Sequence, residues 1–304
     1  MTAPRFLVAG EALVDIVVPS AGEPENAPGG SPLNVAVGLA RLGVDTTLLT
    51  QVGDDELGRL IRTHVLDSDV ELHEASVVPG HATSTATAHI DHTGAASYVF
   101  DLHWTLEPQV LPEGATAVHV GSIGAALRPG RDSVLSLVQE ASRRGLLVTF
   151  DPNARPAFTP DAEEAWRDVR EVAAAADLVK MSDEDLHFLR PGMTAEEMAA
   201  QLLGGATRML VVTFGGDKAV AFSGTATAAV PSRQAQVVDT VGAGDSFMAA
   251  LLAVVAEHGL EELDERRLAA YVAAAHEAAA VTVGRRGADP PRRDELPAGW
   301  PHLG

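Results

Sequence analysis

The densest group of residues that could do chemistry is the segment Asp239–Asp245, which reads Asp-Thr-Val-Gly-Ala-Gly-Asp. The apolar run that follows, Ser246–Glu257, contains no Gly or Pro and predicts a helix. Small residues at a helix start leave backbone N–H groups uncovered, and together with the helix dipole these groups form an anion site. The amides in question are those of Gly242, Ala243 and Gly244.

The carboxylate of Asp245 falls on the first turn of that helix, beside the predicted anion site. Like charges repel, so this carboxylate is a poor phosphate ligand. It is better suited to take a proton from a hydroxyl while the amides hold the group being transferred. We therefore expect phosphoryl transfer from a nucleotide to an alcohol. The simpler interpretation is a helix start stabilised by an acidic first-turn residue.

The composition fits a globular protein and argues against several other classes. The 304 residues are 46% hydrophobic and 21% charged, which is enough for a full core. The formal net charge of −20 does not suit nucleic-acid binding, which usually needs a basic face. No apolar run is long enough to span a membrane, and no export signal or Cys is visible. We expect a cytoplasmic protein without disulfides or Cys-based metal sites.

Short β-branched runs alternate with longer segments rich in Ala and Leu, which predicts a mostly parallel sheet covered on both faces. The predicted strands are Arg5–Ala9, Thr46–Gln51, Ala117–Gly121, Leu146–Asp151, Leu178–Met181 and Met209–Phe214. The predicted helices are Asn34–Leu42, Glu56–Leu66, Arg131–Arg143, Ala162–Ala175, Ala195–Leu203, Ser246–Glu257 and Asp264–Val281. No repeat or low-complexity linker is present, so we expect a single α/β domain over residues 1–304.

One stretch, approximately residues 70–104, breaks this alternation and predicts an antiparallel insertion. Its strand-like pieces are Val70–Val78, Ser84–Asp91 and Ser97–Asp101. Such a sheet is too small to bury both of its faces, so the protein body, a ligand or a second subunit must cover one of them. We favour a lid over a plain surface hairpin, and we expect lid-to-lid packing to form a homodimer.

Polar residues near the N-terminus predict a site for a polyol. Asp15 falls beyond the first predicted strand, where ligands sit in open parallel sheets, and a carboxylate accepts hydrogen bonds from two hydroxyls. Gly29 and Gly30 allow the backbone to approach a ligand closely. Ser31 is interpreted as the N-cap of the next helix, and Asn34 offers a donor and an acceptor one turn into it. Taken alone, these residues also fit a turn and an ordinary capped helix.

Asp239–Asp245 resembles the C-terminal signature of the PfkB/ribokinase family of carbohydrate kinases, and Gly29–Gly43 resembles the family's N-terminal sugar-binding signature. The motifs occur in family order over essentially the whole chain. The resemblance implies a ribokinase-like three-layer αβα sandwich with a small antiparallel β lid. It also implies ATP with Mg²⁺ as the phosphoryl donor. The small hydroxylated substrate would lie between Asp15, Gly29, Gly30 and Asn34 on one side and the lid on the other.

The same resemblance assigns nucleotide and metal residues. The segment Lys180–Asp185 lies where the family carries Asn-x-x-Glu, a motif associated with Mg²⁺ handling through water. Here Ser182 replaces the Asn and Asp185 replaces the Glu, with Glu184 adjacent. The implied nucleotide contacts are Lys180, Ser182, Thr213, Gly215, Gly216 and His276, the last in place of an Asn often found near the adenine. Asp239 and Val241 match the region where many relatives hold a monovalent cation such as K⁺.

The substrate is predicted from three segments that look most like bacterial fructokinases, namely Ser31–Asn34, Asp151–Arg155 and Arg286–Ala288. We therefore expect fructose, phosphorylated on a primary hydroxyl. Ribokinase and 2-keto-3-deoxygluconate kinase are the near alternatives, and Arg155 is the cation that an acidic sugar would need. Lid aromatics are expected over the substrate, and a nucleoside kinase would use them as its slot: Tyr98, Phe100 and Trp104. The changes at Ser182 and Asp185 leave open a non-catalytic sugar- or nucleotide-binding regulator.

Overall fold

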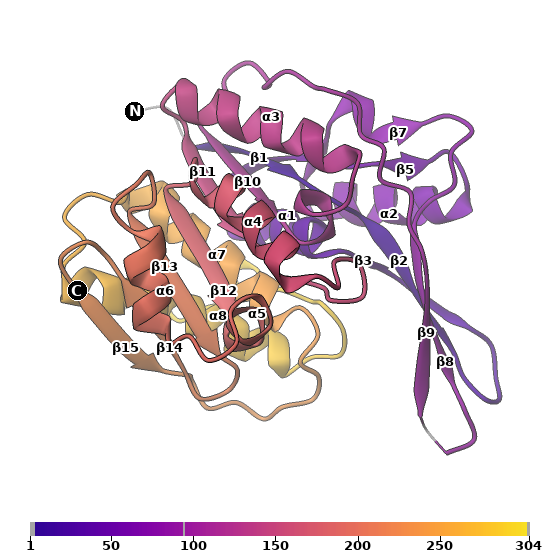
Figure 1. Cartoon of the computed structure of the whole chain (residues 1–304). Coiled ribbons are helices and arrows are strands. Elements are labelled where there is room, and N and C mark those ends of the chain that lie inside the picture. The colour runs from indigo at the N-terminus through magenta and orange to yellow at the C-terminus, as the bar shows by residue number, and fades with distance from the viewer. Residues whose placement is uncertain (1–3, 94, 303–304) are drawn as a thin grey trace.

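The computed structural model describes residues 4–93 and 95–302, so both ends of the predicted domain 1–304 and Gly94 in the predicted lid lie outside the described residues. The centre of the molecule is a nine-stranded sheet in the order β15-β14-β13-β12-β11-β10-β1-β4-β6 (Figure 1). Neighbouring strands are parallel except for the pairs β13–β14 and β14–β15. The strands are β1 (Arg5–Ala9), β4 (Asp45–Leu49), β6 (Glu71–Leu72), β10 (Ala117–Gly121), β11 (Leu147–Asp151), β12 (Leu178–Ser182), β13 (Met209–Phe214), β14 (Lys218–Phe222) and β15 (Thr227–Pro231).

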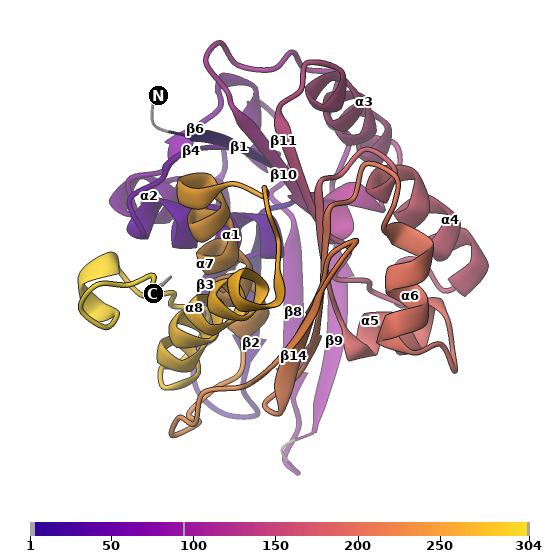
Figure 2. The ribbon, with the colours of Figure 1, turned by 90° about the vertical axis from the view of Figure 1, so that its left-hand side faces the viewer.

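Helices cover both faces of this sheet, which gives three layers (Figure 2). One face carries α1 (Ser31–Arg41), α2 (Glu56–Asp67), α7 (Ala243–His258) and α8 (Glu265–Val283). The other carries α3 (Gly130–Arg143), α4 (Ala162–Ala173), α5 (Asp183–Leu189) and α6 (Ala195–Leu202). Along β1 the side chains alternate between the two cores, with Phe6 and Val8 in the first and Leu7 and Ala9 in the second. The predicted three-layer α/β architecture is confirmed.

The predicted strands and helices are all present, with ends that differ by a few residues. The helix α1 begins at Ser31 rather than Asn34, and α7 begins at Ala243 rather than Ser246. The hairpin β14–β15 and the short helix α5 were not predicted. Both strands of that hairpin are rich in Ala, which carries little strand signal. Within residues 4–93 and 95–302, every helix is too short or too polar to cross a lipid bilayer.

The lid is a separate four-stranded sheet in the order β3-β2-β8-β9, and it projects from one edge of the molecule (Figure 1). Its strands are β2 (Leu13–Val18), β3 (Glu25–Gly29), β8 (Thr85–Ile90) and β9 (Ala96–Asp101). The predicted lid range 70–104 was therefore wrong in one part. The piece Val70–Val78 supplies β6 of the main sheet and β7 (Val77–Val78), which pairs with β5 (Val52–Gly53). The missing half of the lid comes from the N-terminal strands β2 and β3.

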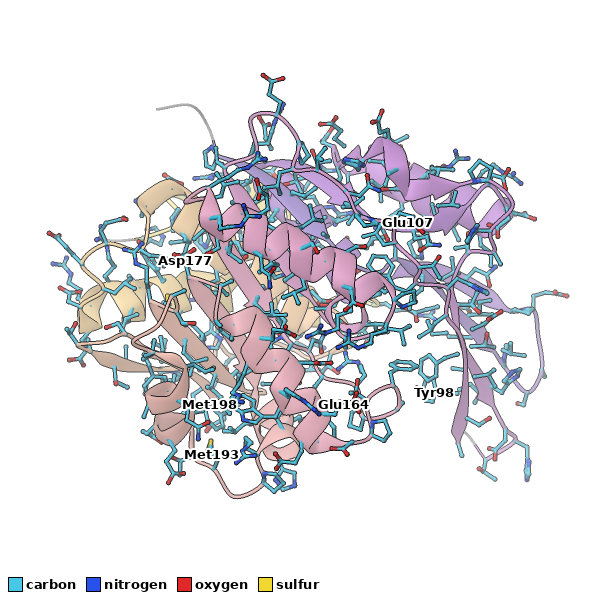
Figure 3. The ribbon with its side chains drawn as sticks, turned by 45° about the horizontal axis from the view of Figure 1, so that its top comes forward. Tyr98, Glu107, Glu164, Asp177, Met193 and Met198 are labelled. Atoms are coloured by element: carbon cyan, nitrogen blue, oxygen red, sulfur yellow. The ribbon has the colours of Figure 1, made fainter. Side chains whose placement is uncertain are left out.

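One face of the lid looks toward the body of the protein. In register across the sheet, Asp15 pairs with Ala86, which pairs with Phe100. Paired residues share a face, and the Phe100 ring meets the Phe158 ring of the body edge-on, with 4.9 Å between centroids. Asp15 and Phe100 therefore line the same inner face, with the small Ala86 between them. Tyr98, which stacks on Phe100, also projects from β9 toward the body (Figure 3).

Candidate active site

The carboxyl ends of β1 and β10 diverge at the point where the strand order reverses. The chain leaves β1 toward the lid and leaves β10 toward the 3-10 turn η2 (Ile123–Ala125). Ligands of open α/β sheets bind in this kind of crevice. Glu11 joins the two ends, because its Oε2 accepts a hydrogen bond from the Gly124 amide at 2.7 Å. Burial raises the pKa of Glu11 to about 7.

The start of α7 presents free backbone amides toward this crevice. Gly242 is the N-cap with φ +75°, and a Cβ there would lie 2.6 Å from the Cβ of Ala288, so only glycine fits. Among the described residues, the amides of Gly242 and Gly244 donate to no protein acceptor. The Ala243 amide, which was predicted to join them, donates instead to the Thr240 carbonyl at 3.2 Å. Two of the three predicted amides are thus available to an anion.

Asp245 lies on the first turn of α7 with 9% of its surface exposed. Its Oδ1 accepts a hydrogen bond from the Ser31 hydroxyl at 2.6 Å, and its Oδ2 accepts one from the Asn34 amide at 2.8 Å. Ser31 was predicted to be the N-cap of α1, but Gly30 occupies that position and the Ser31 side chain makes no capping bond. Asn34 was predicted to contact the substrate, and in this structure its amide is bound to Asp245. Sequence reasoning missed both of these contacts.

Asp15 and the Gly29–Gly30 turn lie together at the lid side of the crevice. A Cβ at Gly29 would lie 2.2 Å from Asp15 Oδ2, so the carboxylate covers that glycine. Gly30 has φ +108°, and a Cβ there would lie 2.7 Å from the Glu11 carbonyl oxygen. Burial raises the pKa of Asp15 to about 6. The predicted grouping of these residues is present, although Asp15 belongs to lid strand β2 rather than to a loop after β1.

Lys180 brings a positive charge to the start of α7. The residue is only 4% exposed, and its Nζ lies 2.8 Å from Asp151 Oδ2. A Cβ added at Gly244 would lie 3.4 Å from the same Nζ, so the ammonium group borders the α7 turn. Burial would lower the pKa of Lys180, but Asp151, Asp185 and Asp245 outweigh it and raise that pKa. The ammonium is therefore charged at neutral pH, while burial raises the pKa of Asp151 to about 6.

A carboxylate beside free helix amides and a buried cation is an arrangement that suits phosphoryl transfer to a hydroxyl. The family model described as "pfkB family carbohydrate kinase" matches residues 5–295. The chain belongs to this family. A fructokinase from Klebsiella pneumoniae is 32% identical over 265 residues, which cover 85% of this chain and 86% of the relative.

Solved structures of similar proteins share this kinase's fold. The structure of fructokinase from Xylella fastidiosa with bound ATP has a TM-score of 0.79 at 24% identity, over 96% of this chain and 95% of the other. A double mutant of fructokinase from Vibrio cholerae O395, with fructose, ADP and potassium ion bound, has a TM-score of 0.78 at 26% identity, over 95% of each chain. The pfkB-family assignment makes the protein an ATP-dependent sugar kinase.

The kinase uses Ser182 and Asp185 to organise its own backbone. Ser182 is the N-cap of α5, and Asp185 Oδ2 accepts hydrogen bonds from the Ser182 amide and hydroxyl, both at 2.8 Å. Asp185 Oδ1 accepts from the Ala154 amide at 2.6 Å, which fixes the loop after β11. Both oxygens of Asp185 are therefore occupied by protein donors. Glu184 stays exposed on the first turn of α5, where its carboxylate is free to meet a hydrated cation.

Other predicted nucleotide residues lie at different distances from the open surface of the kinase. Thr213 is the penultimate residue of β13 and pairs with Ser182 of β12. Gly215 and Gly216 form an open turn after the strand, with no atom within 4 Å of either added Cβ. His276 is a core residue of α8: its ring meets the Phe247 ring and its Nε2 is buried without a hydrogen-bond partner. The predicted adenine contact of His276 does not match this buried position.

Two predicted substrate residues have contrasting positions. Trp104 is 4% exposed, and its Nε1 donates to the Gly124 carbonyl at 3.0 Å. This packing holds the indole in the core, so the expectation that it closes over the sugar was wrong. Arg155 is exposed on the loop after β11, close enough to Glu11 for its charge to offset part of the rise that burial causes in the pKa of Glu11. Arg155 therefore remains available to the crevice.

The loop before α7 is tied to the end of α8. Asp239 Oδ1 accepts from the Val241 amide at 3.1 Å and Oδ2 accepts from the Gly287 amide at 2.8 Å, and these hydrogen bonds lower the pKa of Asp239. Carbonyl oxygens of Gln236, Ala280 and Val281 lie within 4 Å of where a Cβ of Gly284 would be. These carbonyls lie in the region where the family resemblance places a monovalent cation.

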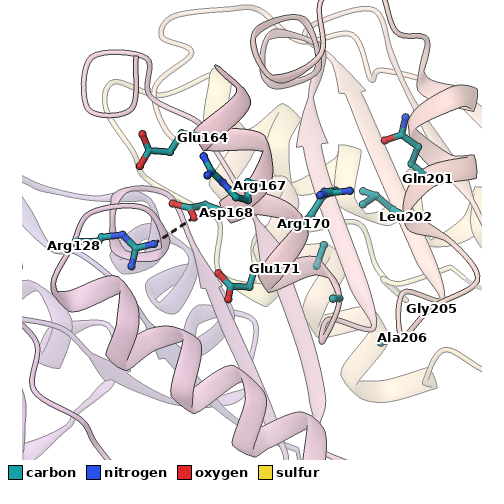
Figure 4. A pocket seen from close by; sticks show the side chains of 12 residues that line it. Arg128, Glu164, Arg167, Asp168, Arg170, Glu171, Gln201, Leu202, Gly205 and Ala206 are labelled. Atoms are coloured by element: carbon teal, nitrogen blue, oxygen red, sulfur yellow. Dashed lines mark ion pairs between the residues drawn. The ribbon is translucent and has the colours of Figure 1, made fainter. Parts of the chain in front are cut away.

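A separate hollow lies on the surface of the kinase, away from this crevice. It measures about 720 Å³ and is lined mainly by charged residues of α4 and by the segment after α6 (Figure 4). Arg128 pairs with Asp168 across it at 3.5 Å. No strand of the main sheet ends among its lining residues, so we place the candidate active site by the residues around Asp245 and not by the volume of a hollow.

Proposed function

We propose that this protein transfers the γ-phosphoryl group of ATP to a primary hydroxyl of fructose. The observation that carries the proposal is the position of Asp245, next to the free amides of Gly242 and Gly244 and across from Asp15 and the Gly29–Gly30 turn. The fructokinase relative from Klebsiella pneumoniae and the fructose-bound fructokinase from Vibrio cholerae O395 support fructose as the acceptor. Because ATP is the donor, we expect the protein to work in the cytoplasm.

In this mechanism the sugar binds between Asp15 of the lid and the Gly29–Gly30 turn. Asp245 accepts the proton of the attacking hydroxyl as its oxygen forms a bond to the γ-phosphorus, and the bond from phosphorus to the ADP oxygen breaks. The amides of Gly242 and Gly244 and the Lys180 ammonium stabilise the charge on the transferring group. Closure of the lid onto Phe158 excludes water that would otherwise compete with the sugar.

The residues present fit the expected ions unequally. Mg²⁺ would neutralise charge on the ATP phosphates, and Glu184 is the carboxylate placed to reach its water shell, because both oxygens of Asp185 are already hydrogen-bonded. The backbone carbonyls of Gln236, Ala280 and Val281 around Gly284 are the oxygens that would hold K⁺. Asp239 fixes the adjoining loop by accepting a hydrogen bond from the Gly287 amide. Both Glu184 and Asp239 can fill these roles from their present positions.

The proposal is tested by measuring ADP release with fructose, ribose, 2-keto-3-deoxygluconate and adenosine as acceptors. We expect kcat/KM to be highest for fructose. A preference of about tenfold or more for another acceptor would replace fructose as the substrate while leaving the kinase mechanism in place. Absence of turnover with every acceptor, while ATP still binds, would favour the non-catalytic regulator.

Asp15 should make the binding of fructose depend on pH. A carboxylate accepts charge-assisted hydrogen bonds from sugar hydroxyls, and a protonated carboxyl does not. Because the pKa of Asp15 is raised to about 6, the ionised form dominates above that pH and disappears below it. We therefore expect the KM for fructose to be flat above about pH 7 and to rise as the pH falls through about 6. Initial rates across this range provide the measurement.

The matched variants for this prediction are Asp15→Asn and Asp101→Asn. The first should raise the KM by about tenfold or more above about pH 7 and remove its pH dependence, so that the variant and the wild type converge at low pH, where the Asp15 carboxyl is protonated. Asp101 lies next to Phe100 on β9 and so points to the opposite face of the lid, where its loss should leave the profile unchanged. A pH-dependent KM that persists in Asp15→Asn would assign the titration to another group.

We further propose that the lid pairs with the lid of a second copy. Beyond the Phe100–Phe158 contact, the inner face continues with Val17, Ala88 and Tyr98, and Tyr98 is 65% exposed. An apolar strip of this kind at the tip of a small sheet needs cover. Light scattering at micromolar concentration should give about twice the 31.7 kDa mass of the monomer.

Two single substitutions separate this dimer contact from general effects on the lid. Tyr98→Ser should shift the mass toward the monomer, whereas Val99→Ser, on the opposite face of the same strand, should not. A wild-type protein that stays monomeric at these concentrations would mean that the strip is covered within one subunit.

A further inference from the structure

A carboxylate at the third position of a helix can accept a hydrogen bond from the backbone amide of that helix's own N-cap residue. In α5, Asp185 folds back so that its Oδ2 accepts from the amide of the N-cap Ser182 at 2.8 Å. In α6, Glu197 does the same with the amide of the N-cap Thr194, also at 2.8 Å. Such capping boxes satisfy a helix amide that otherwise lacks an acceptor. The local spacing in this chain therefore favours the folded-back arrangement.

Asp245 occupies the same third position of α7, whose N-cap is Gly242. By analogy with α5, its carboxylate would accept from the Gly242 amide. Among the described residues it accepts no amide of its own helix, and its recorded donors are the Ser31 hydroxyl and the Asn34 side-chain amide of α1. The helix α1 packs directly against α7, so these donors hold the carboxylate from a neighbouring element.

We propose that Ser31 is a positioning residue that keeps Asp245 away from the Gly242 amide, so that the amide remains free for phosphate and the carboxylate for the sugar hydroxyl. The inference rests on the proposed function and adds a residue to it. The Ser31 hydroxyl and the Gly242 amide thus compete to donate a hydrogen bond to the Asp245 carboxylate. Whenever Asp245 caps its own helix, the site loses its base and one amide of its anion site together.

Ser31 is better placed for this task than for any other. It is the first residue of α1, where its hydroxyl makes no cap because Gly30 takes that role with φ +108°. Its hydroxyl donates to Oδ1 at 2.6 Å, a length typical of a strong bond to a carboxylate. Asn34 holds only the other oxygen, Oδ2. Without Ser31, Oδ1 has no donor from α1 and can turn toward the Gly242 amide.

The test compares Ser31→Ala and Ser31→Thr with the wild type and with Ser136→Ala. Alanine is well tolerated at a helix start, and Ser136 is an exposed helix serine of α3 whose hydroxyl donates to the Asp132 carbonyl of the same helix. We expect Ser31→Ala to lower kcat by about tenfold or more, because a displaced base costs rate rather than binding. The KM for the sugar should stay within about twofold, since Asp15 and the Gly29–Gly30 turn are untouched.

Two further readouts separate positioning from a loss of structure. Ser31→Thr, which keeps the hydroxyl, should restore kcat to within about threefold of wild type. A crystal structure of sugar-free Ser31→Ala should place the Asp245 carboxylate on the Gly242 amide, with an unchanged melting temperature because a capping box replaces the lost bond. The crystal structure remains informative even if no tested sugar is phosphorylated, so a failure of the proposed function is distinguishable from a failure of this inference.

Three outcomes would overturn the inference. The first is a kcat of Ser31→Ala within about twofold of wild type and of Ser136→Ala. The second is an Asp245 carboxylate that keeps its position in the Ser31→Ala crystal structure. The third is a failure of Ser31→Thr to recover activity although the protein folds with the wild-type melting temperature.

Discussion

Replacing Asp245 with Asn should lower kcat by about 10²–10⁴-fold while leaving the binding of ATP and fructose nearly unchanged. The amide keeps the shape of the carboxylate, and its oxygen can still accept the hydrogen bond from Ser31. It has lost the ability to take a proton from the attacking hydroxyl. Turnover should therefore fall although the site remains assembled. Calorimetry measures the binding of ATP and fructose. The rate of ADP release, under conditions in which the chemical step limits turnover, measures kcat.

The control for this substitution is Glu265→Gln, which removes an acidic first-turn residue from α8 without touching the crevice. Its kcat should match that of the wild type. A kcat for Asp245→Asn within about threefold of wild type would contradict the role of Asp245 as base, and would return it to the simpler interpretation of a helix-stabilising residue.

Replacing Lys180 with Met should lower kcat/KM for ATP by about 10²–10³-fold, because the phosphate end of the site loses its buried positive charge. The crevice already holds the carboxylates of Asp151, Asp185 and Asp245, so a polyphosphate meets repulsion there unless a cation offsets it. Lys180 and Lys218 are the chain's two lysines, which makes Lys218→Met a matched control. Lys218 lies over the Phe214 ring of β13, 5.4 Å from its centroid.

The partner of Lys180 needs its own variant, because Lys180→Met leaves Asp151 buried without its cation. The raised pKa of Asp151 means that it will take up a proton in that case, which limits the damage to folding. The double variant Lys180→Met/Asp151→Asn removes the unpaired carboxylate together with the cation. If it regains a kcat/KM for ATP close to that of Lys218→Met, the loss came from the orphaned carboxylate and not from phosphate binding.

The parts of the site that could be predicted are those whose requirements are local. The Asp239–Asp245 turn needs glycines at a helix start and a carboxylate on the next turn, and both are visible in consecutive residues. The grouping of Asp15 with Gly29 followed from the rule that ligands bind beyond strand ends, even though β2 and β3 were not recognised as lid strands. The register of β2 is set by pairing with β8, about 70 residues away, and β3 in turn pairs with β2, so no local pattern reports it.

Contacts between distant residues decided what could not be predicted. The bond from Ser31 to Asp245 joins positions 214 apart, and at the level of sequence Ser31 has the ordinary signature of a helix cap. Trp104 and His276 are residue types that suit ligand contacts, but burial against Gly124 and Phe247 uses them for packing instead. Whether Trp104 and His276 contact a ligand depends on how the side chains around them pack, and the hydrophobic periodicity of the sequence does not report that packing.

The path of the chain through the lid has a mechanical consequence. Strand β3 ends at Gly29 and α1 begins at Ser31, so Gly30 alone joins the lid to α1. Ser31 and Asn34 of that helix donate hydrogen bonds to Asp245. We expect a movement of β3 to reach Ser31, whose hydroxyl donates to Asp245. We also expect a bound sugar to favour closure of the lid, whereas a water molecule makes too few contacts to do so. The connectivity of the fold thus supplies a reason for phosphate to pass to a sugar rather than to solvent.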